Sequence, residues 1–279
     1  MRDVDYGWVI RYMHTTGASL FFAVVYLHMF RGLLYGSYQK PKELVWIFGC
    51  TIYLAMMAEG FLGYVLPYGQ MSYWGAQVII SLFGAIPYIG ESLELWVRGD
   101  YYISGITVSR FFALHVVALP LVLIALVFLH LVALHEVGAG NPEGVDIEKY
   151  LDDDGVPLDS VPFFPYKVLN ALIAIGVFMT VFSIIMFFFP EGGGYFIEMA
   201  NFQEANPLVT PDHIAPVWYY APFYTMLRAI PDPLGGLIVM AAAVAIFFVV
   251  PWLDRSKVAS IRYKGIYSKI AITLFGVSF

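Results

Sequence analysis

Residues 11 to 37 read RYMHTTGASLFFAVVYLHMFRGLLYGS, an apolar run that is long enough to cross a membrane. Two histidines, His14 and His28, lie inside this run, fourteen residues apart. In an α-helix, this interval corresponds to about 21 Å of rise and returns to within about 40° of the same face. The spacing therefore predicts that both imidazoles leave one side of one helix, at two depths.

A second apolar run, residues 110 to 136, repeats the pattern as RFFALHVVALPLVLIALVFLHLVALHE. Its histidines, His115 and His130, are fifteen residues apart, so a regular helix would rotate them about 60° away from each other. Pro120 lies between them. Because a proline deletes a helix hydrogen bond and often introduces a kink or a wide turn, we predict a π-bulge or kink near residues 118 to 121.

The composition places the whole chain in a membrane. Hydrophobic residues make up 60% of the chain, charged residues only 13%, and the mean hydropathy is +0.73. Soluble domains have about 25% charged residues. The single cysteine, Cys50, excludes a disulfide framework and a thiolate metal site, and a net charge of -6 without a basic stripe argues against a nucleic-acid partner.

Five runs satisfy the length rule for membrane spans, and we expect an all-α polytopic membrane protein. The expected spans are residues 8 to 36, 44 to 66, 106 to 135, 168 to 190 and 234 to 252. A sixth run begins after Lys264 and stops at Phe279, which is too short to cross and suggests a fragment. Two long aromatic segments rich in Gly and Pro, residues 67 to 102 and 195 to 233, predict amphipathic surface helices on the outer side.

Charge in the loops predicts the orientation. Basic residues follow the first and fifth spans, which makes those loops cytoplasmic by the positive-inside rule: Lys40, Lys42, Arg255, Lys257, Arg262 and Lys264. The first and third spans then run in the same direction. We therefore expect His14 level with His115 near the outer face, and His28 level with His130 near the inner face.

Two imidazoles at each level suit two metal centres. Zinc or copper would require three or four ligands gathered at one point, whereas two axial nitrogens suit a six-coordinate haem iron. A lone histidine in a span could instead bond a neighbouring helix, but two pairs at matching intervals favour metal ligation.

Other residues could hold the macrocycles. Gly49 and Gly63 repeat the fourteen-residue interval, so each is expected to leave a hollow for one haem edge, although glycines also serve helix packing. Arg11 and Arg31 lie three residues from His14 and His28, and with Ser37 they are candidates to bind propionates, although such arginines also reach lipid headgroups.

Three stretches carry a family resemblance: GYVLPYGQMSYWGA at 63 to 76, GNPEG at 140 to 144, and PVWYYAPFYTMLRAIPDPLGG at 216 to 236. Together with the histidines they resemble the cytochrome b subunit of quinol:cytochrome c reductases, the cytochrome bc1 complexes, of the bacterial type. The resemblance implies a four-helix haem-binding bundle, with its first helix missing here, followed by further transmembrane helices. The implied domains are residues 1 to 166, the di-haem part, and 167 to 279, a truncated C-terminal part with the outer quinol-site loop.

The resemblance also implies an activity. A low-potential b-type haem would be held by His14 and His115, and a high-potential one by His28 and His130. Quinol would be oxidised at an outer pocket. One electron would cross through both haems to a quinone near His135, and the other would pass to an iron-sulfur protein. This electron transfer would be coupled to proton translocation. The outer pocket would be lined by Tyr64, Gly75, Ala76, Val78, Ile79, Pro216, Val217, Tyr219 and Tyr224.

Cofactors and partners follow from the same resemblance. They are two non-covalent b haems, ubiquinone or ubiquinol as substrate, a Rieske iron-sulfur protein, cytochrome c1, lipid and a second copy in a homodimeric complex, in the bacterial cytoplasmic membrane. No nucleic acid is expected.

The sequence departs from the family pattern at both quinone sites. Val217 stands where the family usually has an acidic residue that accepts a quinol proton, so we hypothesise that the proton leaves through Tyr64, Asp212, His213 or water. At the inner site, Ala171, next to Asn170, replaces the usual aspartate.

Two other functions remain open at this point. One is a di-haem quinone-reactive membrane anchor of another dehydrogenase, which would lack the two outer amphipathic segments. The other is a haem-free transporter. Paired α-band absorption on reduction would separate both haem proteins from the transporter.

Overall fold

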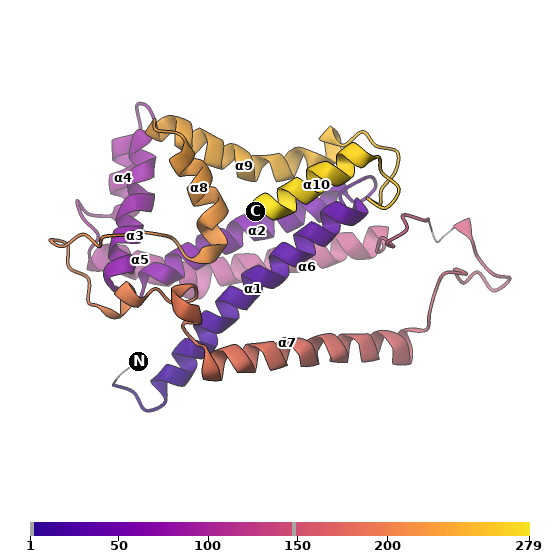
Figure 1. Ribbon diagram of the computed structural model, residues 1–279, viewed down its shortest axis with the longest axis horizontal. Coiled ribbons are helices and arrows are strands. Elements are labelled where there is room, and N and C mark those ends of the chain that lie inside the picture. The colour runs from indigo at the N-terminus through magenta and orange to yellow at the C-terminus, as the bar shows by residue number, and fades with distance from the viewer. Residues whose placement is uncertain (1–2, 147–148) are drawn as a thin grey trace. The chain divides into compact units, whose positions relative to one another are not determined.

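The computed structural model describes residues 3–146 and 149–279, which form helices joined by loops (Figure 1). Five helical segments are long and apolar enough to span a membrane, as the sequence predicted: Gly7–Tyr35, Glu43–Val65, Gly105–Val137, Phe163–Phe188 and Pro233–Leu253. The predicted boundaries differ from these by a few residues at most. The sixth apolar run forms α10 (Ile266–Ser278), which has 13 residues and is shorter than a span.

The described chain divides into two compact units. The first unit falls within Met1–Ser37, Ala139–Gly193 and Ser256–Ser278, and the second within Tyr38–Gly138 and Gly194–Arg255 together with Phe279. Each unit therefore draws on both sides of the domain boundary predicted at residue 166, which stays a prediction.

The first unit packs α1 (Gly7–Tyr35) against α7 (Val168–Phe188). The hydroxyl of Tyr12 donates to Oε1 of Glu191 over 3.3 Å. Helix α1 ends at Gly36, whose φ of 63° is left-handed. A Cβ there would lie 2.6 Å from the carbonyl oxygen of Ala259, so both backbone conformation and space require glycine.

The second unit is organised around α2 (Glu43–Val65), which packs along α6 (Leu119–Val137) and against α9 (Pro233–Leu253) (Figure 1). The buried indole of Trp46 donates to the carbonyl oxygen of Phe247 over 2.7 Å, joining α2 to α9. Its hydrophobic core gathers side chains from α2, α3 and the start of the third span: Leu62, Val65, Tyr73, Ala76, Ile80, Ile103 and Phe111.

The third span contains one wide turn. It consists of α5 (Gly105–Ala113), a π-helical turn η2 (Leu114–Ala118) and α6. The wide turn was predicted near residues 118 to 121 and lies four residues earlier, so that it includes His115. The physical reason is that Pro120 crowds the carbonyl of Val116 and cannot bond it, which widens the backbone before the proline. The extra residue in the histidine interval is absorbed there.

The two outer segments carry short helices, as predicted. The first holds α3 (Gln70–Ser81), η1 (Leu82–Ala85) and α4 (Gly90–Arg98), and the second holds η6 (Met199–Phe202), η7 (Trp218–Tyr220) and α8 (Ala221–Ala229). Isolated β-bridges join Gly69 to Glu204 and Leu151 to Pro157.

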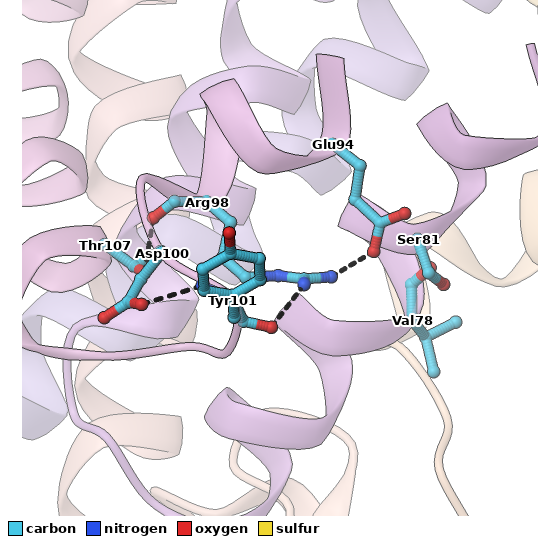
Figure 2. Close-up of polar contacts among 7 residues, drawn as sticks. All are labelled: Val78, Ser81, Glu94, Arg98, Asp100, Tyr101 and Thr107. Atoms are coloured by element: carbon cyan, nitrogen blue, oxygen red, sulfur yellow. Dashed lines mark hydrogen bonds and ion pairs between the residues drawn. The ribbon is translucent and has the colours of Figure 1, made fainter. Parts of the chain in front are cut away.

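A buried arginine holds the connection from α4 to α5 (Figure 2). The guanidinium of Arg98 pairs with Glu94 and donates from Nη1 to the carbonyl oxygen of Tyr101 over 2.8 Å. The hydroxyl of Thr107 donates to the carbonyl oxygen of Arg98 over 2.7 Å. Ser104 and Thr107 form a capping box that starts α5. This loop is therefore fixed where the third span begins.

Candidate functional site

Two histidines of the third span lie against α2 at two levels. We call the first the His115 level, made of His115, Glu59 and Gly63, and the second the His130 level, made of His130, Val45 and Gly49. On α2, Glu59 and Gly63 follow Val45 and Gly49 by fourteen residues, so the uninterrupted helix repeats one face. All six residues belong to the second unit.

At the His115 level, the imidazole ring packs on Gly63. A Cβ at residue 63 would lie 2.9 Å from both ring nitrogens, closer than real Cβ atoms approach. The Nδ1 atom of His115 lies 3.0 Å from the carbonyl oxygen of Glu59 and 3.0 Å from its Oε1. Because a carbonyl only accepts hydrogen bonds, Nδ1 carries the proton, so Nε2 is the ring nitrogen that could ligate a metal.

At the His130 level, the ring is half-buried against the backbone of Val45. A Cβ at residue 49 would lie 3.3 Å from Cε1 of His130, so this hollow is less tight than that at Gly63. The side chain of Val45 offers no polar atom to the imidazole.

These residues fit a haem. Each histidine belongs to an apolar span, and each faces a glycine of α2 that leaves open the space a Cβ would fill. Imidazole nitrogens of this kind are the usual axial ligands of six-coordinate haem iron. Within the described residues no group of three or more His, Cys, Asp or Glu side chains could hold another metal ion.

The other predicted haem residues belong to the first unit. His14 and His28 lie on α1, which runs without interruption from Gly7 to Tyr35, and both are exposed within this chain. The guanidinium of Arg31 lies 5.8 Å from the ring centroid of Tyr35. Arg11 lies one turn into α1, and Ser37 follows its last glycine. Their roles stay predictions.

A cavity of about 330 Å³ lies within the second unit, between α2, α3 and the segment around α8. It is lined by apolar and aromatic side chains. The predicted quinol-pocket residues that line it are Tyr64, Gly75, Val78, Ile79, Pro216, Val217 and Tyr224. Two others do not: Ala76 and Tyr219 are buried in the surrounding core, 1% and 5% exposed.

The tyrosines around this cavity differ in their hydrogen bonds. Tyr220 donates to the carbonyl oxygen of Met57 over 2.7 Å. Tyr224 donates to the carbonyl oxygen of Ile214 over 3.0 Å and accepts from Nη1 of Arg228 over 2.8 Å. The buried hydroxyl of Tyr64 belongs to a side chain that also lines the cavity. Tyr220 and Tyr224 therefore brace the wall with bonds to backbone carbonyls.

The loop over the cavity is tied to the start of α3. Gln70 donates from Nε2 to the carbonyl oxygen of Val209 over 2.9 Å and accepts from the backbone of Asn206 over 2.7 Å. Ser72 donates to the carbonyl oxygen of Tyr64 over 2.6 Å. Gln70 is only 5% exposed, so this polar contact is shielded from solvent and holds the loop in one position.

Tyr68 supports the same corner from the loop after α2. Its hydroxyl donates to the carbonyl oxygen of Ile103 over 2.9 Å. Burial raises the pKa of Tyr68, and the neighbouring Tyr73 and Tyr102 raise it further. The phenol therefore keeps its proton, and this bond, to a higher pH than an ordinary tyrosine would.

Three predicted residues lie away from the cavity. Asp212 and His213 are exposed and do not line it, although the next residue, Ile214, does. His135 is exposed in the last turn of α6. Ala171 and Asn170 are exposed near the start of α7, in the first unit.

Sequence reasoning missed Glu59 and Tyr220. Glu59 could have been found, because it is the one charged residue between positions 44 and 65 of the sequence and an ionisable group in a span is costly. Tyr220 had no such signal, since it adjoins Tyr219 and the register of η7 decides which of the two faces the cavity.

Comparison with known proteins gives consistent matches. A family model described as Cytochrome b/b6/petB matches residues 1–138, and one described as Cytochrome b(C-terminal)/b6/petD matches residues 204–279. The cytochrome b of Allochromatium vinosum is 58% identical over 100% of this chain and 69% of its own length. The cytochrome b of Rickettsia bellii is 50% identical over 99% of this chain and 66% of its own length.

A solved structure of a hyperthermophilic respiratory complex III is similar over 99% of this chain and 70% of the matched chain, with a TM-score of 0.89 and 36% identity. The relatives and the structural match thus agree with the all-helical arrangement of membrane spans. The chain belongs to the cytochrome b family, in the bc1 type that is part of respiratory complex III.

Proposed function

We propose that this chain oxidises quinol in the cavity of the second unit and conducts one of the two electrons across the membrane. The observation that carries the proposal is the cavity itself, which is apolar, about 330 Å³ in volume, and lined by most of the residues expected for a quinol site. Cofactor and substrate pockets typically have this character and volumes of about 300–1,000 Å³.

The lining explains how a quinol ring would be held. Aromatic walls such as Phe61 and Phe223 suit a flat ring, and Gly75 leaves room beside Tyr64, where an added Cβ would lie 4.0 Å from Cε1 of that tyrosine. Pro216 and Val217 complete the wall, and the segment that leads to them is bonded to Gln70 at Asn206 and Val209.

Val217 cannot accept a proton, so another group must receive the proton that leaves the quinol hydroxyl. Tyr64 lines the cavity, whereas Asp212 and His213 lie outside it. Tyr64 is therefore our candidate for the first proton relay from the quinol hydroxyl.

Four histidines of this chain would hold two b-type haems, His14 with His115 and His28 with His130. When bound, these groups carry single electrons between the two levels. The pairing rests on the predicted orientation, in which the first and third spans run in the same direction, and the π-helical turn absorbs the extra residue of the second interval. Arg11 and Arg31 would neutralise the propionates and Ser37 would donate a hydrogen bond to one. Gly49 and Gly63 would leave room for the macrocycle edges.

The second electron would leave through a Rieske iron-sulfur protein and cytochrome c1, in a homodimeric, proton-translocating complex of the bacterial cytoplasmic membrane. Ubiquinone would be reduced near His135, at the opposite end of the third span. Relatives that are named cytochrome b and the structural match to a complex III support these partners.

The test uses the assembled complex in detergent. We expect b-type α-bands in the reduced-minus-oxidised spectrum and two midpoint potentials in a redox titration. His115→Leu should remove one of these midpoints and His130→Leu the other. Gly75→Leu should fill the cavity and abolish quinol oxidation while both midpoints remain. Absence of b-type absorption in the wild type, or full activity in Gly75→Leu, would contradict the proposal.

A further inference from the structure

Glu59 is an acidic residue in the middle of an apolar span. It lies in α2, and the sequence has no other charged residue between positions 44 and 65. Its side chain is 20% exposed. An ionisable group at such a position is expensive, so it is expected to have a specific partner and a function.

Its partner is the ring of His115. Oε1 of Glu59 and the carbonyl oxygen of the same residue both lie 3.0 Å from Nδ1 of His115. The other carboxylate oxygen, Oε2, is buried without a hydrogen-bond partner among the described residues. The carboxylate is therefore directed at the imidazole and is not part of a wider polar network.

The His130 level has the same backbone arrangement without the acid. The backbone of Val45 faces the ring of His130, four residues before Gly49, as Glu59 precedes Gly63. The carboxylate is thus not needed to pack an imidazole against α2, because the second histidine does so with a valine.

We propose that Glu59 is a positioning residue for His115, which lowers the reduction potential of the haem that His115 would ligate. This rests on the proposed function, in which Nε2 of His115 binds iron. A carboxylate that accepts the Nδ1 proton of a ligating histidine fixes its tautomer and ring orientation and raises its basicity. A more basic ligand beside an anion stabilises ferric over ferrous iron.

The experiment is a spectroelectrochemical titration of the assembled complex. Glu59→Gln keeps the size and one acceptor oxygen but removes the basic carboxylate, and Glu59→Ala removes both. A tenfold loss of ferric stabilisation, the lower end of the effect usual for such outer partners, raises a one-electron midpoint by about 59 mV. We expect a rise of this order for the His115 haem alone, larger in Glu59→Ala, with Glu59→Asp close to the wild type.

The His130 haem is the internal control, because its level carries Val45 in place of the acid. Selective loss of the His115 haem in the Glu59 variants would also support the proposal. Unchanged midpoints, or equal shifts of both haems, would overturn it. If the wild type lacks two haem midpoints, the proposed function fails instead, so the two failures are distinguishable.

Discussion

The His115 level and the His130 level lie on the same face of α2, fourteen residues apart along the helix. Each places an imidazole of the third span against a glycine of α2, with a backbone carbonyl one turn earlier. They differ in the side chain on that turn, Glu59 in one and Val45 in the other, and in the closeness of the glycine. The same backbone arrangement thus surrounds both imidazoles, but the side chain beside one ring is acidic and that beside the other is apolar.

The surroundings also differ. The cavity is lined from α2 by residues between Leu54 and Tyr64, which are the turns around Glu59 and Gly63. At the other end, α2 is fastened by hydrogen bonds from Trp46 to α9 and from Tyr38 to Asp254. The His115 level therefore lies next to the cavity, whereas the His130 level lies next to hydrogen bonds that fix the end of α2.

The largest expected effect comes from adding a side chain to the two glycines. Gly63→Ala should abolish binding of the His115 haem, because the new Cβ would fall 2.9 Å from both ring nitrogens. Gly49→Ala should keep most of the His130 haem. Its new Cβ would lie 3.3 Å from Cε1 of His130, and a shift of a few tenths of an ångström relieves such a contact. The reduced-minus-oxidised spectrum measures the haem content of each variant. Equal haem losses in the two variants would contradict the expectation that the His115 ring packs more tightly on its glycine than the His130 ring does.

The next effect concerns the cavity. Tyr64→Phe should lower the turnover of quinol oxidation about 100-fold, since a positioned proton-transfer group contributes at least that much. Asp212→Asn and His213→Gln are matched controls outside the cavity and should leave the rate and its pH profile unchanged. Initial rates of cytochrome c reduction across pH provide the measurement. Normal activity in Tyr64→Phe would remove the tyrosine from the proton route.

A smaller effect is expected where α2 is fastened near Val45. Trp46→Phe leaves the buried carbonyl of Phe247 without its 2.7 Å hydrogen bond, which costs about 1–3 kcal/mol of stability. Thermal melting in detergent should show a lower midpoint, with both haem midpoint potentials retained. A potential shift confined to the His115 haem would mean that the two levels are not independent.

The smallest effect depends on pH. Burial, and then the hydrogen bond that Tyr38 donates to Asp254 over 2.7 Å, raise the pKa of Tyr38 above its ordinary value of 10.0. A raised pKa means that the stabilisation is complete below pH 10 and decreases as the pH rises through the folded-state pKa. Melting temperatures between pH 8 and about 11 should therefore fall more steeply in the wild type than in Tyr38→Phe. Parallel curves would exclude this contribution.

Much of the fold could be predicted because a membrane imposes a length rule on apolar runs. The five spans and the short surface helices follow from hydropathy and from Gly and Pro alone. The position of the wide turn could not be placed exactly from Pro120, because a proline distorts the turn before it and the sequence does not show how far the distortion extends.

The cavity shows what sequence alone leaves open. Most of its expected lining residues face it, since they lie on motifs with a fixed register. Ala76 and Tyr219 do not, because one helical step turns Ala76 into the core and η7 directs Tyr220 instead of Tyr219 to the cavity. The partnership of Glu59 with His115 joins residues 56 positions apart and depends on the packing of two helices, which no local pattern encodes.

The wide turn that contains His115 gives the third span a tolerance to changes of length. Since this turn already accommodates one surplus residue, deleting a residue there and replacing Pro120 would restore a regular helix with the same angular phase between His115 and His130. The same deletion made in the regular helix beyond Pro120 would rotate His130 by about 100°. Removal of one residue from this span is thus tolerated at the wide turn and changes the relative orientation of the two histidines when it is made elsewhere.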